Sequence, residues 1–181
     1  MYPALALIEV NSIAIGMVVS DACVKKAAVD LLQSRPIAPG RYITLFWGDV
    51  GEVEEAFLEG TRIAQDTLVG QLFLPGAHDS LIEALVAVAQ PTPVDSIAIV
   101  ELYTLSATLL SADAALKAAD VQLLEMRLAA GIDGKGYFVL TGELYDVEAA
   151  VEAATEAIEP ATLVRTETIA APSPDFTDFI W

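Results

Sequence analysis

Apolar runs of strand length and amphipathic runs of helix length alternate along the chain. Residues 4–10 are rich in leucine, isoleucine and valine, which predicts a strand. Ser12 follows that run and offers a side-chain oxygen that can cap a helix. From Ile13 to residue 28 the apolar side chains recur at helical spacing, Met17 and Val24 among them. The chain therefore begins with a strand followed by a helix.

The same alternation continues to about residue 90. A stretch with two prolines and a glycine interrupts it once, and such a stretch predicts a loop because these residues break regular pairing. The further predicted elements are a strand over 29–34, this loop over 35–40, a strand over 42–47, a helix over 50–64, a strand over 67–74 and a short helix over 80–88.

The chain then repeats itself. Residues 96–124 align with residues 4–32 without a gap, and nine of the 29 positions are identical. A repeat of this length fixes the number of domains at two. The second copy predicts strands over 97–102, 121–128, 137–141 and 162–169, helices over 106–119 and 144–158, and a loop over 129–136.

Read twice, this order predicts an α+β chain of two tandem ferredoxin-like domains. Each domain has a split β-α-β arrangement, in which helices cover one face of an antiparallel sheet. We place the domains at residues 1–90 and 94–181, with a linker at about 90–95 that contains a Pro-x-Pro pair. The tail from residue 170 onward shows no clear period, and we expect its aromatic side chains to pack on a surface.

Composition narrows the classes of partner. The chain is 55% hydrophobic and only 19% charged, which is more apolar than an average soluble domain. Its longest run without Asp, Glu, Lys or Arg, residues 67–78, contains Pro75 and Gly76 and is too short to span a bilayer. We therefore expect extensive subunit contact and no membrane. The net charge of −17 disfavours nucleic acid, whose phosphates require a basic patch.

Cysteine usage points to a reducing compartment. The single cysteine, Cys23, excludes an internal disulfide and any multi-cysteine metal site within one chain. No basic leader opens the sequence, so export is not indicated. We expect a cytoplasmic protein.

Several stretches resemble the shell proteins of bacterial microcompartments. They are ALALIEVNSIAIG at the start, the helix sequence from Asp21 to Ala27, the Pro-Gly-Arg-Tyr loop exit and Gly48-Asp-Val-Gly-Glu-Val. Because the pattern occurs twice, the chain is similar to the trimeric class with two tandem, unpermuted BMC domains. The resemblance implies a homotrimer that mimics a hexagon, a pseudohexamer. It also implies tiling with other shell proteins in the bacterial cytoplasm, and a central pore for small polar metabolites.

The resemblance further implies which residues line that pore. They lie in the loops between the second and third strands of each domain, three copies of each loop. Proline stiffens the first loop, whereas glycine allows close backbone approach in the second. Lysine in triplicate would favour anions and aspartate would oppose them, so the charge preference is open. The expected lining residues are Arg35, Pro36, Ile37, Ala38, Pro39 and Gly40, and Gly131, Ile132, Asp133, Gly134, Lys135 and Gly136.

Lys25 and Lys117 match the edge lysine of the family, which contacts its twin across the seam between tiles. The alternative is a local i, i+4 pair with Asp21 or Asp113, worth about 0.2–0.5 kcal/mol each. His78 matches a further edge residue. The arginine that commonly accompanies such a histidine is absent from both copies, which predicts one edge contact fewer.

No cofactor is expected. Some tandem members place a cysteine in the first pore loop, where three copies could hold an iron–sulfur cluster. The corresponding residue is Ala38, which cannot ligate iron. Cys23 lies mid-helix and is expected to be a small buried hydrophobe. We expect neither a cluster nor another metal.

The remaining chemical groups do not predict catalysis. The segment from Gly131 to Lys135 has the wrong spacing for a phosphate-binding loop. His78 is the only histidine, and no motif places a nucleophile near it. Glu9 and Glu101 occupy mirrored positions and are expected to form interface hydrogen bonds. We therefore expect no catalytic residue and no enzyme. The alternative to a tile is a small-molecule-binding or regulatory trimer of ferredoxin-like fold that does not tile.

Overall fold

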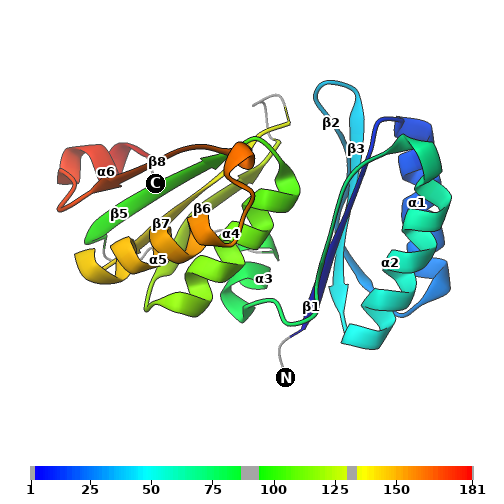
Figure 1. The fold of residues 1–181 in the computed structure, drawn as a ribbon, viewed down its shortest axis with the longest axis horizontal. Coiled ribbons are helices and arrows are strands. Elements are labelled where there is room, and N and C mark those ends of the chain that lie inside the picture. The colour runs from blue at the N-terminus through cyan, green and yellow to red at the C-terminus, as the bar shows by residue number, and fades with distance from the viewer. Residues whose placement is uncertain (1–2, 87–93, 130–133, 181) are drawn as a thin grey trace. The chain divides into compact units, whose positions relative to one another are not determined.

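The computed structural model of the chain describes residues 3–86, 94–129 and 134–180. It divides into two compact units (Figure 1). The first comprises Met1–Asp79 with Ala129–Gly134, and the second comprises Ser80–Leu128 with Lys135–Trp181. Most of the linker expected at about 90–95 lies outside the described residues, and the domain limits 1–90 and 94–181 stay a prediction.

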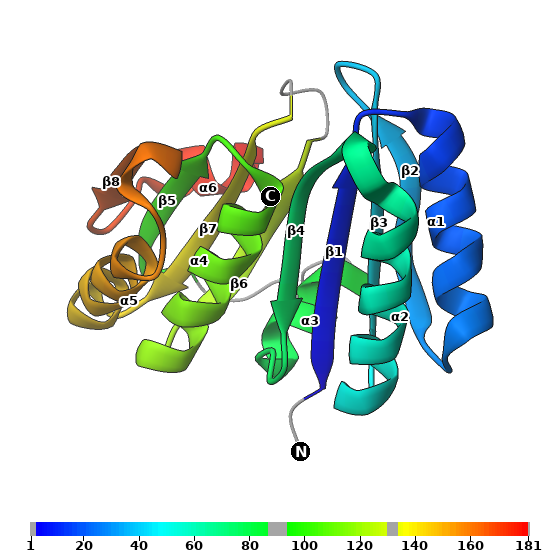
Figure 2. The same ribbon diagram turned by 45° about the vertical axis from the view of Figure 1, so that its right-hand side comes forward.

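The first unit is a four-stranded antiparallel sheet with two helices on one face (Figures 1 and 2). The strand order is β2-β3-β1-β4. Strand β1 is buried along its whole length because it lies between two strands and beneath the helices. The elements are β1 Ala4–Val10, α1 Ile13–Lys26, β2 Asp30–Ile37, β3 Arg41–Gly48, α2 Val50–Ala64, a 3-10 turn Gln65–Thr67 and β4 Leu68–Leu74.

The second unit repeats this topology, with strand order β6-β7-β5-β8. Helices α4 and α5 pack against each other and against its sheet (Figure 2). Its elements are α3 Asp79–Val86, β5 Ser96–Leu102, α4 Leu105–Ala118, β6 Gln122–Leu128, β7 Gly136–Gly142, α5 Leu144–Glu156, a 3-10 turn Pro160–Thr162, β8 Leu163–Ile169 and α6 Pro174–Ile180.

Helix α1 begins at Ile13, as predicted, and its counterpart α4 begins at Leu105, one residue before the predicted start. The Ser12 hydroxyl accepts a hydrogen bond from the Ile15 backbone N–H at 3.4 Å. Thr104 does the same for Ala107 at 3.2 Å. Each oxygen satisfies a backbone donor that the first turn of a helix leaves without a partner. The repeat is thus visible in the caps as well as in the strands.

Two predicted features differ from the structure. The loop expected over 35–40 is shorter, because β2 continues through Pro36 to Ile37. Strand β2 is an edge strand, where a proline without an N–H is tolerated. The tail, in which no period was found, contains the short helix α6. Seven residues are too few for a helical period to stand out.

The two units differ at one position where a helix packs on the sheet: the larger residue is on the strand in the first unit and on the helix in the second. Tyr42 lies opposite Val10 in the first sheet, and Gly136 lies opposite the equivalent Leu102 in the second. In the first unit Gly16 of α1 makes room for the ring of Tyr42, because a Cβ there would lie 2.3 Å from that ring. In the second unit Thr108 of α4 occupies the helix position, and the strand position is the glycine.

Replacing Gly16 by alanine is expected to lower the free energy of unfolding by about 1–3 kcal/mol, because the added methyl group overlaps the Tyr42 ring. Urea denaturation followed by circular dichroism measures this. Gly51→Ala is the matched control, since nothing lies within 4 Å of a Cβ at Gly51. That change is expected to be neutral or to stabilise by up to about 1 kcal/mol. Equal effects of the two changes would contradict the packing described.

Candidate functional site

The first candidate loop is a tight hairpin tip between β2 and β3. Its three residues, Ala38, Pro39 and Gly40, are exposed, and the Ala38–Pro39 peptide bond is cis. Gly40 has φ of +88°, a conformation that glycine adopts without steric cost, and its N–H donates to the Ile37 carbonyl at 3.0 Å. The tip itself therefore presents no charged side chain.

The other three residues expected to line an opening in the first unit belong to strand β2. Arg35, Pro36 and Ile37 pair with β3, so they lie below the tip. The Arg35 side chain donates through Nε to Oε1 of Gln33 at 3.1 Å. Ile37 is buried. The expectation that all six residues form one loop is therefore wrong, and their role as lining residues stays a prediction.

The second hairpin joins β6 to β7. Of its predicted lining residues, Gly131, Ile132 and Asp133 lie outside the described residues. Gly134 has φ of +79° and is again a position that favours glycine. Gly136 is buried and is the first residue of β7.

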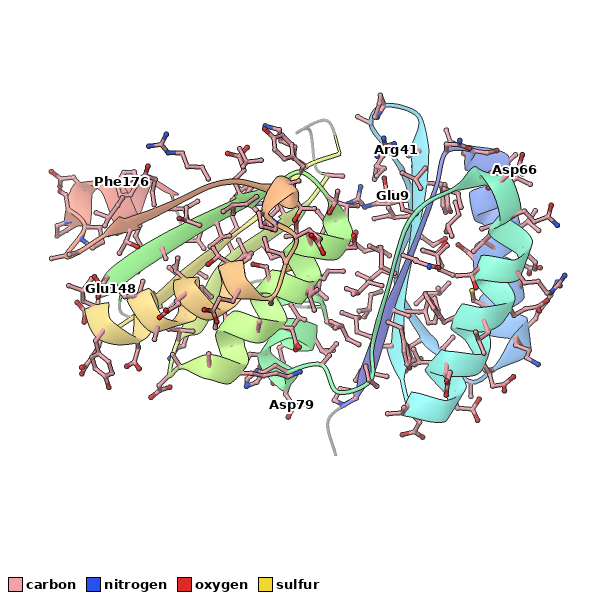
Figure 3. The ribbon with its side chains drawn as sticks, viewed as in Figure 1. Glu9, Arg41, Asp66, Asp79, Glu148 and Phe176 are labelled. Atoms are coloured by element: carbon pink, nitrogen blue, oxygen red, sulfur yellow. The ribbon has the colours of Figure 1, made fainter. Side chains whose placement is uncertain are left out.

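A cation and a carboxylate pair at the base of each hairpin. In the first unit Nη1 of Arg41 donates to Oε1 of Glu9 at 2.9 Å, and Figure 3 shows the two side chains close together. In the second, Nζ of Lys135 donates to Oε1 of Glu101 at 3.2 Å. The strand registers make the two pairs equivalent, because Arg41 precedes the partner of Val10 and Lys135 precedes the partner of Leu102.

These pairs were missed from the sequence, where the mirrored glutamates were expected at an interface. A signal was present. Glu9 and Glu101 are identical in the two copies, and a basic residue follows the hairpin glycine in both. Only the antiparallel pairing of β1 with β3 and of β5 with β7 brings the two positions together across about 30 residues of chain.

The two ion pairs differ in burial. The Glu9 side chain is 4% exposed, whereas that of Glu101 is 40% exposed. The Lys135 ammonium group also lies 5.5 Å from the centre of the Tyr103 ring, within the range of a cation–π contact. Arg41 therefore has a buried charge to neutralise, and Lys135 has a partly solvated one.

Arg41→Ala is expected to lower the free energy of unfolding by about 3 kcal/mol, because it leaves the buried Glu9 carboxylate without its cation. Lys135→Ala is the matched comparison and is expected to cost about 1 kcal/mol or less, since water reaches Glu101. Urea denaturation of both variants at one protein concentration tests this. A larger effect for Lys135→Ala would contradict the assignment.

The lysines expected at a tile edge lie at the ends of the first helices. Nζ of Lys25 is 2.6 Å from Oδ2 of Asp21, and Nζ of Lys117 is 2.5 Å from Oδ2 of Asp113. The local i, i+4 pairs therefore exist. The Lys25 side chain is nonetheless 73% exposed, which leaves it open to a further contact. The edge role of both lysines stays a prediction.

His78 lies between β4 and α3 and is half-buried. Its expected edge contact stays a prediction. Nothing in its position next to α3 suggests a catalytic use.

Cys23 is the buried hydrophobe that the sequence predicts. It is fully buried, and its thiol donates to the Ala56 carbonyl at 3.4 Å. Burial, with a smaller contribution from Glu59, raises the pKa of this thiol to about 12, so it remains protonated at neutral pH. Ala38 carries no thiol. Neither residue can supply a thiolate at the hairpin tip, and the expected absence of an iron–sulfur cluster stays a prediction.

The part of the chain that the structure describes has neither a cluster of metal ligands nor a membrane-spanning helix. No group of three or more His, Cys, Asp or Glu side chains there is arranged to hold a metal ion. No helix there has the length and apolar character needed to cross a bilayer.

Comparison with known proteins assigns the family. Residues 4–77, and again residues 96–172, match the BMC domain. The chain belongs to the BMC domain family. It is 39% identical over 173 residues to the bacterial microcompartment shell protein PduT of Citrobacter freundii, and the match covers 95% of this chain and 94% of PduT.

Solved structures agree with this assignment. A microcompartment protein from Desulfitobacterium hafniense DCB is 34% identical and superposes with a TM-score of 0.93, covering 98% of this chain and 99% of that one. The fused permuted hexameric shell protein MSM0275 from the RMM microcompartment has a TM-score of 0.63 at 24% identity, over 86% and 83% of the two chains, and shares the fold alone.

The resemblance noted in the sequence is therefore confirmed. So is the predicted fold class, α+β with two tandem BMC domains, each an antiparallel four-stranded sheet with helices.

Proposed function

We propose that this BMC-domain chain is a structural component of a bacterial microcompartment shell. It is not an enzyme. Support comes from PduT, a shell protein that it matches over nearly its whole length, and from the two complete domain copies. The shell lies in the bacterial cytoplasm and is shared with other shell proteins.

The assembled unit is a homotrimer, and one comparison between the two domains carries this proposal. On α1 an apolar stripe is exposed: Ile13 is 39%, Met17 55% and Val24 42% accessible. The equivalent residues of α4, one repeat later, are Leu105, Leu109 and Leu116, and all three are buried.

The stripe on α1 is therefore exposed in the single chain, although the equivalent residues of α4 are buried. A second copy of the chain supplies the missing cover, because it carries the same type of domain. If every α1 stripe meets the next copy, the contact is head to tail and closes into a ring. Three chains with two domains each give six domains, which matches the hexagonal tile that the family resemblance implies.

Met17→Lys is expected to break this trimer, because it buries a charge without a partner in an apolar contact. Size exclusion with light scattering should show a shift from about 57 kDa, three times 19.1 kDa, toward the single chain. Leu58→Lys is the matched control. Leu58 of α2 is 57% exposed, and its counterpart one repeat later, Glu152 of α5, is exposed as well, so this position is expected to face solvent.

A Met17→Lys protein that stays trimeric would contradict the use of this stripe. Dissociation of the trimer by Leu58→Lys would show that the α1 stripe is no more important for assembly than the exposed surface of α2.

The tile packs against others through the helix-end lysines. Lys25 and Lys117 are the only basic residues that occupy equivalent positions in the two copies of the helix, since Lys26 is answered by Ala118. In a six-domain ring these lysines recur at every edge. His78 belongs to the same rim.

Lys25→Ala combined with Lys117→Ala is expected to abolish extended hexagonal layers in electron micrographs of concentrated protein while leaving the trimer intact. Lys25→Ala removes an exposed pair worth only about 0.5 kcal/mol to the fold. Lys117→Ala is expected to cost more, because its partner Asp113 is buried. Lys26→Ala is the control, because it removes a neighbouring lysine whose partner is Glu55 at 3.1 Å. Layers that survive the double change would contradict the edge role.

The hairpin tips line a central pore for small polar metabolites, with the first and second hairpins alternating around the threefold axis. The alternative of a regulatory, non-tiling trimer is not favoured. A shallow cavity of about 390 Å³ in the second unit is lined by Asp95, Ser96, Glu143, Leu144, Tyr145 and Glu148, a set that contains neither histidine nor cysteine.

A further inference from the structure

We propose that a shallow cavity in the second unit binds a guanidinium group, the planar cation at the end of an arginine side chain. The cavity has a volume of about 390 Å³ and lies where strand β5 and helix α5 begin. Its lining residues, all of the second unit, are Asp95, Ser96, Glu143, Leu144, Tyr145 and Glu148. The inference goes beyond the proposed shell role and does not depend on it.

A buried hydroxyl group in the cavity lacks a hydrogen-bond partner. Ser96 is only 3% exposed, and its carbonyl oxygen accepts from the Thr141 hydroxyl at 2.9 Å. Among the residues that the structure describes, none bonds to the Ser96 hydroxyl itself. Every fully enclosed side-chain oxygen or nitrogen of those residues has a partner, so this hydroxyl is not enclosed and faces the cavity that Ser96 lines. Buried polar groups are nearly always bonded, and the occupant of the cavity therefore supplies the missing partner.

The charge of the cavity favours a cation. Three of the six lining residues carry carboxylates, namely Asp95, Glu143 and Glu148, the last of which Figure 3 labels. In the described part of the chain no lysine or arginine forms an ion pair with any of them. The pKa of Tyr145 is raised, most by a hydrogen bond to Asp146 and by its charge, then by the charges of Glu143 and Asp120. Negative charge therefore surrounds the Tyr145 ring.

The apolar part of the lining selects an organic cation over a metal ion. Tyr145 is 66% and Leu144 41% exposed, so an occupant can contact both side chains. No group of three or more possible metal ligands is arranged to hold an ion within the described residues. A guanidinium group stacks on aromatic rings, is weakly hydrated and has five N–H donors for carboxylate and hydroxyl oxygens. An ammonium group is more strongly hydrated and does not stack.

The first unit shows which of these features the fold itself requires. Carboxylates at the start of a helix stabilise it through its dipole, and α2 begins with Asp49 and Glu52 as α5 begins with Glu143 and Asp146. The other features belong to the second unit alone. Asp95, Ser96, Asp120 and Tyr145 occupy the positions of Pro3, Ala4, Ala28 and Gly51. The first unit therefore lacks the ring, the hydroxyl group and two of the carboxylates.

Peptide titration followed by nuclear magnetic resonance of the whole chain tests the inference. Acetyl-Gly-Arg-Gly-amide is added in about 0.15 M NaCl, which screens the general attraction of cations to a chain of net charge −17. The backbone amide shifts of residues 144–148 report binding. The same peptide with citrulline, a neutral isostere of arginine, is the matched control. We expect the arginine peptide to bind at least about tenfold more tightly.

Variants test the individual side chains, with circular dichroism to check that each is folded. Tyr145→Ala is expected to weaken binding about two- to fivefold, whereas Tyr145→Phe keeps the ring and the affinity. Ser96→Ala restores the residue of the first unit and is expected to weaken binding about threefold. Glu148→Gln is expected to weaken it about two- to fivefold. Glu54→Gln removes the equivalent exposed carboxylate of α2 and is expected to change nothing.

Methylguanidinium identifies the source of the group. Weaker binding of methylguanidinium than of the arginine peptide supports a side chain of a partner protein, whereas equal binding supports a free guanidinium compound. Equal binding of the arginine and citrulline peptides would overturn the inference. So would arginine binding that neither Tyr145→Ala nor Glu148→Gln weakens, since a diffuse attraction to an acidic protein behaves in that way.

Discussion

The exposed apolar face of helix α1 is the main physical constraint on this protein in water. The α1 stripe of Ile13, Met17 and Val24 is too apolar to remain in water without cost, at about 25 cal/mol for each Å² that could be buried. The equivalent residues of α4 are buried and the stripe itself is exposed, which fits a member of a family whose proteins assemble into shells. The high apolar content and the low charged fraction of the sequence follow from the same requirement. A surface that packs against a neighbouring molecule must be apolar although it is not part of the core of its own domain.

Duplication of the domain within one chain makes such a contact easier to form. A domain of about 90 residues buries a modest fraction of its surface by itself and gains from a neighbour of its own kind. Joining two copies in one chain keeps a neighbour of the same kind at a high effective concentration. The two copies are free to differ once they are joined, and they do so where helix meets sheet. Gly16 with Tyr42 in one, and Thr108 with Gly136 in the other, fill equivalent space with opposite sizes.

Much of the fold could be predicted from the sequence, because the strand period is strong over seven residues and the helix period over 13 or more. The repeat, the order of elements and the cap at Ser12 all came from local pattern. Pattern could not show which face of α1 points inward. Ile13, Met17 and Val24 have helical spacing, yet Gly16, Val19 and Cys23 form the buried face. Both faces are apolar, so periodicity identifies the helix without assigning its sides.

The candidate site was harder to predict from the sequence, for a related reason. Taken by itself, Pro36 indicates a loop. Strand β2 continues through it because β2 lies at the edge of the sheet. The partners Glu9 and Arg41 are joined by sheet register, which a linear reading does not contain. The edge roles proposed for Lys25 and His78 would involve neighbouring molecules, which the sequence of one chain does not describe.

The difference between the two hairpins has a genetic consequence. In a ring built from a single-domain protein, any substitution in the opening is made six times at once. In the trimer proposed above, a change at Ala38 would be made three times and would leave the positions contributed by Gly134 untouched. Half of the rim can therefore acquire a new size or chemistry while the other half preserves the old one, which lets the opening be altered in smaller steps than sixfold symmetry permits.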